Sequence, residues 1–296
     1  MGNKKKEIKT WSTPVESREL LTIPCASCGG THFKKALQCE GFGYVRCTRC
    51  GLIQMNPQPL PEDVKRRYQE GSGKDYLSYE IANEASFLRL QELALGDAGF
   101  EKIERAFLET GRTRLLDIGS ATGALLGKLK TRGWNVTGIE ISTPQADYAR
   151  NERGLDIIGV PLEKAGLGPD SFDVVLASHL IEHLNNPGLF VREVYRILKP
   201  GSYFLVTTPN ISGFQGRLMQ SRWRSAIFDH LYLFSKKTLT RLLKDTGFSI
   251  EGTATWGGLA AGLAPKPVKA AADRAAKRFG FGDVMLIKAK KPGYSP

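Results

Sequence analysis

Residues 115–140 constrain the fold more than any other stretch of the chain. The run from 113 to 118 is apolar at three of its last four positions, which is typical of a buried strand. Residues 119–123 are small and rich in glycine, and the leucines that follow recur at helical spacing. A second apolar run, 136–139, ends at Glu140. This order predicts a strand, a tight turn, a helix and a second strand that ends in an acid.

Such an order suits the binding of a nucleoside. A turn without large side chains lets backbone N–H groups approach a ligand, and the positive end of the following helix attracts negative charge. Glu140 lies roughly 20 residues beyond Asp117, where a carboxylate can accept hydrogen bonds from both hydroxyls of a ribose. The dinucleotide fingerprint itself is absent, because Ala121 and Ala124 stand where glycines are required. We therefore expect one βαβ half that binds a nucleoside.

The strings LLDIGSATG and VTGIE resemble motif I and the acidic loop of class I S-adenosylmethionine-dependent methyltransferases. The resemblance implies an α/β fold with a Rossmann-like seven-stranded sheet. It also implies that Asp117 and the turn hold the methionine end of S-adenosylmethionine, and that Glu140 holds its ribose. Ala121 departs from the family, which usually has a glycine there. A Rossmann or flavodoxin-like unit without this cofactor is the alternative that these motifs leave open.

Further cofactor residues follow from the same resemblance. The family often places an aspartate after the third strand, expected here at 156–159, to bind the adenine amino group, but only Glu163 is near. We therefore expect the backbone around Leu162 to contact adenine. The full set expected to bind the cofactor is Asp117, Gly119, Ser120, Ala121, Gly123, Glu140, Ile141, Leu162, Glu163 and Ser178.

Four cysteines near the N-terminus follow the pattern C-x2-C-x18-C-x2-C: Cys25, Cys28, Cys47 and Cys50. This spacing lies in the range of tetrathiolate zinc sites, and a glycine follows each pair, which lets backbone N–H groups point at the sulfurs. With short strands expected at 42–46 and 52–55, the segment is predicted to be a zinc ribbon. A closed shell of four thiolates leaves no open position for chemistry, so this zinc would be structural. A redox role and a disulfide pair are the alternatives, and Cys39 is left outside the pattern.

Composition and charge limit the partners and the cellular location that we expect for the protein. The net charge of +12 favours anionic partners such as nucleotide-linked sugars, phospholipid head groups or RNA, without deciding among them. No run of about 18 uncharged apolar residues occurs, so we expect no membrane span. The basic start of the chain lacks the apolar region of a secretion signal, and Lys6 stands where a myristoylation signal has Ser or Thr. These features predict a cytoplasmic protein.

The segment SHLIEHLNNP carries two of the four histidines of the chain and follows a predicted strand at 172–177. Ligands of open parallel sheets bind beyond the carboxyl ends of the strands. His179, Glu182 and His183 are spaced so that a helix would place them on one face. Three readings are open: a histidine acts as general base on an acceptor hydroxyl, the three residues bind a divalent metal, or they stabilise the loop without chemistry. We reject the inverted zinc-protease motif H-x-x-E-H, because the segment follows a buried strand of a nucleoside-binding sheet.

Four segments are predicted along the chain. They are a basic flexible tail (1–20), the zinc ribbon (21–60), pre-core helices (61–112) and the S-adenosylmethionine-binding domain (113–296). In the related methyltransferases the pre-core helices lie over the cofactor, so Tyr68 and Tyr76 are candidates for cofactor contacts or for ordinary packing. The long segment 211–234 is mixed basic and aromatic, which predicts a lid or a substrate wall.

The whole order of motifs is similar to that of methyltransferases that carry a zinc ribbon. Paired cysteines, a prolyl linker, motif I, an EHL segment, a TPN segment and an HLYLF segment follow one another between residues 23 and 290. This resemblance implies the enzyme class but not the acceptor. It also implies an antiparallel pair of final strands, expected at 248–256 and 284–289.

A narrower resemblance concerns small-RNA 2′-O-methyltransferases. Their metal site consists of an acid or histidine, a glutamate, a histidine and a later histidine, and the analogous places here hold His179, Glu182, His183 and His230. The sequence has no recognisable RNA-binding module, and similar histidines occur in members that act on small molecules. Metal-dependent methylation of RNA is therefore kept as an alternative, and His230 joins the catalytic candidates.

The leading hypothesis is a methyltransferase that moves the methyl group of S-adenosylmethionine to a hydroxyl or carbon of a small or carrier-linked acceptor, such as a sugar or a surface-glycan precursor. The sulfonium is already activated, so the enzyme mainly aligns donor and acceptor and, for a hydroxyl, provides a base. Nucleic acid is a less favoured acceptor. The competing hypothesis is a non-catalytic zinc-ribbon adaptor with a degenerate nucleotide fold.

Overall fold

A computed structural model describes residues 19–69, 73–258 and 265–293. The predicted basic tail, 1–20, therefore lies almost entirely outside the described residues, as does the side chain of Tyr68. Among the described residues no helix is long and apolar enough to cross a membrane.

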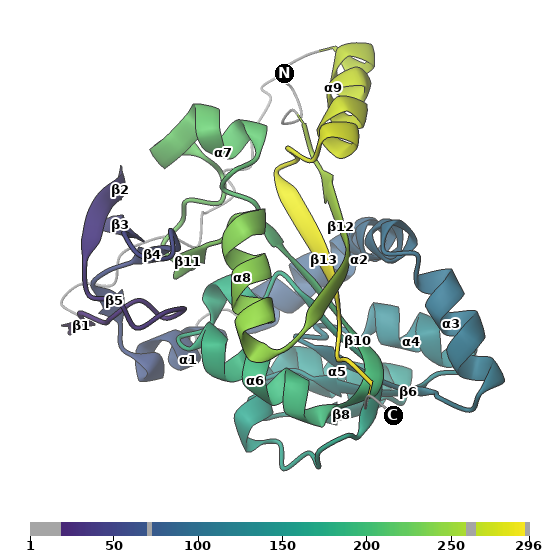
Figure 1. Cartoon of the computed structure of the whole chain (residues 1–296). Coiled ribbons are helices and arrows are strands. Elements are labelled where there is room, and N and C mark those ends of the chain that lie inside the picture. The colour runs from purple at the N-terminus through teal and green to yellow at the C-terminus, as the bar shows by residue number, and fades with distance from the viewer. Residues whose placement is uncertain (1–18, 70–72, 259–264, 294–296) are drawn as a thin grey trace, which may run out of the picture.

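The centre of the molecule is a seven-stranded sheet with the order β12-β13-β10-β9-β6-β7-β8 (Figure 1). All neighbouring pairs from β10 to β8 are parallel, while β13 is antiparallel to both of its neighbours. This confirms the Rossmann-like seven-stranded sheet and the antiparallel final pair. The strands are β6 (Arg114–Ile118), β7 (Asn135–Ile139), β8 (Asp156–Ile158), β9 (Phe172–Ser178), β10 (Leu198–Pro209), β12 (Ser249–Trp256) and β13 (Val284–Lys290).

Apolar side chains of the sheet alternate between two cores, one on each face. Leu115 packs with one core and Leu116 with the other, as the two-residue period of a strand requires. One face is covered by α2 (Gly73–Asp97), α3 (Phe100–Glu109), α4 (Ala124–Thr131) and α5 (Thr143–Arg153). The opposite face is covered by α6 (Pro187–Ile197) and α8 (Lys236–Thr246), while α9 (Lys266–Phe279) packs beside β12.

The ribbon forms a second sheet with the order β11-β4-β3-β2, on the side of the molecule away from α3 (Figure 1). Its strands are β2 (Phe33–Cys39), β3 (Phe42–Cys47), β4 (Ile53–Met55) and β11 (Tyr232–Leu233). The sequence predicted strands near β3 and β4 but neither β2 nor β11. The fourth strand comes from the segment expected to be a lid, so the ribbon sheet extends beyond residues 21–60. The predicted segment boundaries stay predictions.

Hydrogen bonds and a shared apolar core attach the ribbon to residues 227–233 and to the body of the protein. The hydroxyl of Tyr44, whose residue is 1% exposed, lies 2.8 Å from the carbonyl oxygens of both Ile227 and His230. The N–H of Met55 donates to the carbonyl of Leu231 at 2.8 Å. Ribbon residues also belong to the same core as α6 and α8. The ribbon is therefore built into the body of the protein and fixes the chain around His230.

The segment 211–234, for which the sequence predicted a lid or a substrate wall, contains regular secondary structure. It contains α7 (Phe214–Met219), the 3₁₀ helix η3 (Gln220–Arg222) and β11. Three smaller elements belong to the N-terminal part: β1 (Leu20–Leu21) pairs with β5 (Gln58–Pro59), and α1 (Pro61–Gln69) follows.

Replacing Tyr44 by Phe removes the hydroxyl and leaves the buried carbonyl of His230 without this donor. We expect the free energy of unfolding to fall by about 1–2 kcal/mol, measured by urea denaturation of the metal-loaded protein. Tyr79→Phe is the matched control, since that ring lies on an exposed part of α2, and it should change stability by less than about 0.5 kcal/mol. Equal effects of the two changes would contradict the docking role of Tyr44.

Candidate functional site

The turn after β6 has a backbone that favours glycine. Gly119, Ala121 and Gly123 all have positive φ angles, of 77°, 50° and 73°. For Ala121 this left-handed conformation costs about 1–2 kcal/mol more than for glycine, because the Cβ atom crowds the backbone. That cost explains why glycine is usual at this position in the family that the sequence resembles. The turn lies at the edge of the sheet where the parallel strands end, the usual place for a ligand.

Glu140 faces this turn. Its Oε2 accepts a hydrogen bond from the N–H of Ala121 at 3.0 Å, and its Oε1 accepts one from the N–H of Ser142 at 2.8 Å. Burial raises the pKa of Glu140, while these backbone donors and that of Ile141 partly oppose the rise. The sequence-predicted acid and turn are thus brought together.

Two further buried carboxyl groups lie close to Glu140. Burial, with the charge of Glu140, raises the pKa of Asp117 to about 7 and that of Glu80 on α2 to about 7. No salt bridge joins any of the three to a basic side chain in the part of the chain that the structure describes. Oε2 of Glu80 and Oγ of Ser120 are also buried without a hydrogen-bond partner there. The site therefore suits a ligand that carries positive charge and hydroxyl donors.

Helix α2 covers the turn through Glu80 and Glu84, which the sequence analysis missed, and carries Tyr76, which it named as a candidate. Glu84 accepts a hydrogen bond from the hydroxyl of Thr122 at 3.1 Å and pairs with Arg153. Burial and the charges of Glu80 and Glu140 raise the pKa of Tyr76 to about 12. Two acids spaced four residues apart on a helix usually indicate a solvated face, so no sequence signal marked Glu80 or Glu84.

The other cofactor candidates lie at or after the carboxyl ends of β7, β8 and β9. Ile141 follows Glu140 directly, and Ser178 is half-buried at the end of β9. Leu162 is buried in the 3₁₀ helix η1 (Leu162–Lys164), whereas Glu163 in the same helix is exposed. Their proposed contacts with the cofactor stay predictions.

A buried carboxylate marks the second half of the site. Glu182 lies in the 3₁₀ helix η2 (Ile181–His183) and is 1% exposed. Its Oε2 accepts a hydrogen bond from the hydroxyl of Thr208 at 2.9 Å. Its Oε1 is 3.4 Å from Nδ1 of His179 and accepts no hydrogen bond within the described residues. Burial alone would raise the pKa of Glu182, but the adjacent ring of His179 and the charge that the nearby histidines carry when protonated lower it.

Two imidazole rings meet beside this carboxylate. Nδ1 of His183 lies 2.9 Å from the carbonyl oxygen of Asp229, and Nδ1 of His230 lies 2.8 Å from that of Ser225. A carbonyl oxygen can only accept, so each Nδ1 carries the proton and each Nε2 carries the lone pair. The ring centroids are 4.7 Å apart. Burial and the other ring lower the pKa of His183 to about 4, and burial also lowers that of His230, so both rings are neutral.

Glu182, His183 and His230 each place one ligand atom within 4.8 Å of the others. A carboxylate with two neutral imidazoles, each held by a backbone carbonyl through Nδ1, is the donor set of many divalent-metal sites. The sequence expectation that a helix presents His179, Glu182 and His183 on one face is wrong. The helical segment is a single 3₁₀ turn that excludes His179, which has a φ of 51° and a side chain that is 49% exposed.

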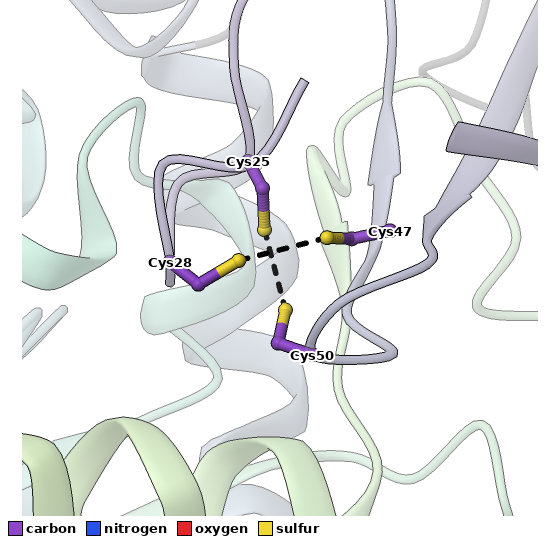
Figure 2. Close-up of side chains that lie close together, drawn as sticks. All are labelled: Cys25, Cys28, Cys47 and Cys50. Atoms are coloured by element: carbon purple, nitrogen blue, oxygen red, sulfur yellow. Dashed lines mark hydrogen bonds between the residues drawn. The ribbon is translucent and has the colours of Figure 1, made fainter. Parts of the chain in front are cut away.

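The four ribbon cysteines point toward one another (Figure 2). Sγ of Cys25 is 3.4 Å from that of Cys50, and Sγ of Cys28 is 3.6 Å from that of Cys47. Sulfur atoms at about 2.3 Å from a tetrahedral zinc ion lie about 3.8 Å apart, so the cluster fits such an ion closely. None of these thiols forms a disulfide.

Backbone donors favour the thiolate form of Cys47. Burial would raise the pKa of Cys47, but N–H groups of Cys50 and Arg49 and the thiols of Cys28 and Cys25 lower it to about 7, whereas burial raises the pKa of Cys25 and Cys50. Gly29 and Gly51 have φ angles of 69° and 83°, the turn geometry that aims these N–H groups at the sulfurs. Cys39 lies outside the cluster, and its Sγ is 3.8 Å from the carbonyl oxygen of Ala226.

A family model described as a methyltransferase domain matches residues 87–252, which is more than half of the chain. The ubiquinone biosynthesis O-methyltransferase of Caulobacter vibrioides is 40% identical over 133 residues, which cover 42% of this chain and 50% of that protein. The mitochondrial ubiquinone biosynthesis O-methyltransferase of Rattus norvegicus is 30% identical over 106 residues, 33% of this chain and 31% of that protein. The chain thus spans about half the length, or less, of these curated relatives.

Solved structures are similar as well. A Thermotoga maritima protein, described as a SAM-dependent methyltransferase and possible histamine N-methyltransferase, is 25% identical. It superposes with a TM-score of 0.49, covering 66% of this chain and 97% of that one.

Elemental analysis of the purified protein should find one zinc ion per chain in the ribbon. Cys47→Ser removes one thiolate of four, so it should lose this ion and lower stability. Cys39→Ser is the matched control and should retain the metal, because Cys39 is outside the cluster. Retention of zinc by Cys47→Ser, or an equal loss in both variants, would contradict the assignment.

Proposed function

Because the chain belongs to the family of methyltransferase domains, we propose that it is an enzyme that transfers a methyl group from S-adenosylmethionine to a hydroxyl of a small or carrier-linked acceptor. The observation that carries the proposal is the group of buried acids, Asp117, Glu140 and Glu80, that surrounds the glycine turn without a basic partner among the described residues. The similarity to relatives named O-methyltransferases supports oxygen as the acceptor atom.

These acids match the chemistry of the donor. S-adenosylmethionine carries positive charge on its sulfonium and amino groups, and when bound it supplies a methyl group on a sulfur that leaves as a neutral thioether. Asp117 and Glu80 would offset that positive charge. Each oxygen of Glu140 already accepts one backbone N–H and has a second lone pair, so Glu140 can also accept from the ribose hydroxyls.

On the acceptor side, methylation of a hydroxyl requires alignment with the methyl group and removal of one proton. His179 is half-exposed, and its Nδ1 lies 3.4 Å from Oε1 of Glu182, which can orient the ring. His179 would therefore take the proton and release it to solvent. His183 is a poor base at neutral pH, because its pKa is near 4.

A second candidate function is metal-dependent methylation. The observation in its favour is the trio of Glu182, His183 and His230, whose ligand atoms lie within 4.8 Å of one another. A divalent ion held there would lower the pKa of an acceptor hydroxyl. This observation bears on the metal and does not select RNA as the acceptor.

Calorimetric titration tests the donor site. The protein should bind S-adenosylmethionine, and Glu140→Gln should weaken binding about tenfold or more, because a carboxylate hydrogen bond is lost. Glu101→Gln, on an exposed part of α3, is the control and should have no effect. Binding should tighten from pH 6 to pH 8, by about tenfold if one of Asp117 and Glu80 must be ionised and by about a hundredfold if both must, since both have pKa values near 7.

S-adenosylhomocysteine lacks the sulfonium charge and should show a smaller dependence on pH. No binding of S-adenosylmethionine at millimolar concentration would reject the proposal. Binding without transfer of labelled methyl to any component of a cell extract would favour the non-catalytic adaptor instead.

Histidine variants distinguish a reaction that uses His179 as the base from one that requires a metal ion. His179→Ala should lower kcat by about 10²–10⁴ with little change in the affinity for S-adenosylmethionine, whereas His32→Ala in the ribbon should leave kcat unchanged. If a metal is required, chelation should abolish activity, added Mg²⁺ or Mn²⁺ should restore it after zinc is returned to the ribbon, and His183→Ala should prevent the restoration. Indifference to chelators would exclude the metal-dependent function.

A further inference from the structure

A basic pocket of about 800 Å³ lies next to the chain that follows β10. Its wall is formed by β3 of the ribbon, the chain just after β10, α7, the start of α8 and the turn between α9 and β13. These elements lie far apart in the sequence, and the ribbon contributes Arg46 to the wall.

The pocket is strongly positive. Arg46, Arg217, Lys236 and Lys237 line it, and none of its lining residues among those described is acidic. None of the four forms a salt bridge within the described part of the chain, where the one hydrogen bond of their side chains is from Arg46 to the carbonyl of Gly51 at 3.5 Å. The N-terminus of α8 opens into the same space at Ser235 and adds its positive dipole. Cations gathered in a concave wall without counter-charges attract an anionic ligand.

Aromatic rings occupy the other part of the wall. Phe279 and Phe281 are stacked with an interplanar angle of 2° and centroids 6.2 Å apart. Phe279 is 73% exposed and Phe214 is 44% exposed, so apolar rings face solvent next to the cations. Such rings suit a flat base or an apolar chain.

The position of the pocket connects it to the proposed reaction. Ile211 and Ser212 line the pocket and follow Thr208, which binds the carboxylate of Glu182, by only a few residues. The turn at Phe281 precedes β13, which pairs with β10 at Pro209. The pocket and the histidine cluster therefore share one edge of the sheet.

We propose that this pocket binds an organic diphosphate, with the phosphates on the four cations and the organic group on the phenylalanine rings. This inference rests on the proposed function, because it makes the diphosphate the carrier of the acceptor whose hydroxyl reaches the histidine cluster. Two sources share this chemistry, a nucleoside diphosphate and a prenyl diphosphate, and the experiment distinguishes them.

Equilibrium binding to the full zinc-loaded chain tests the pocket without requiring methyl transfer. The probes are uridine diphosphate, farnesyl diphosphate, inorganic pyrophosphate and vesicles that contain an anionic phospholipid. We expect one of the two organic diphosphates to bind at micromolar to submillimolar concentration and at least tenfold more tightly than pyrophosphate. Arg217→Ala and Lys236→Ala should each weaken that binding about tenfold, and the charge reversal Arg217→Glu should weaken it further.

Arg105→Ala, an exposed cation on α3, is the matched control and should bind as the unchanged protein does. Titration of each variant with S-adenosylmethionine checks the fold and keeps failure of the pocket distinct from failure of the donor site. The proposal is overturned if neither organic diphosphate binds, if pyrophosphate binds equally well, if only the vesicles bind, or if the pocket variants behave like Arg105→Ala.

Discussion

The docking of the ribbon on residues 227–233 is the interaction on which the acceptor half of the site depends. Tyr44 binds the carbonyls of Ile227 and His230, and β4 pairs with β11. His230 can meet Glu182 and His183 only if this stretch of chain is held in place. The ribbon, whose four cysteines are grouped as a tetrahedral zinc ion would require, thereby shapes a site some 180 residues further along the chain.

The donor half depends on an electrostatic imbalance. Asp117, Glu140 and Glu80 are buried together, and the raised pKa values show that the folded protein resists ionising all three. Ala121, held with a positive φ, adds backbone strain at the same place. Strain and unmatched charge concentrate at functional sites, where a ligand of opposite charge relieves them. Stability and binding are therefore opposed in this part of the molecule.

The sequence predicted the features that depend on local patterns. The strand, turn, helix and acid of residues 115–140 were predicted, as were the cysteine cluster and the family. Features set by tertiary contacts were missed. Neighbouring lysines hide β2, a strand without a fully buried residue, and β11 is a strand only because β4 lies beside it. Glu80 and Glu84 resemble solvated helix residues until α2 is placed over the turn, and a single 3₁₀ turn at Glu182 has no sequence period.

The register between β4 and β11 has an evolutionary consequence. Tyr232 lies opposite Gln54 and Leu233 opposite Ile53, so the ribbon sheet is completed by residues that belong to the other half of the chain. If a homologue acquired the ribbon of another, this shared sheet would be broken unless β4 and β11 were inherited together. The ribbon and the segment around residue 232 are therefore expected to diversify as one unit, even though nearly 180 positions separate them.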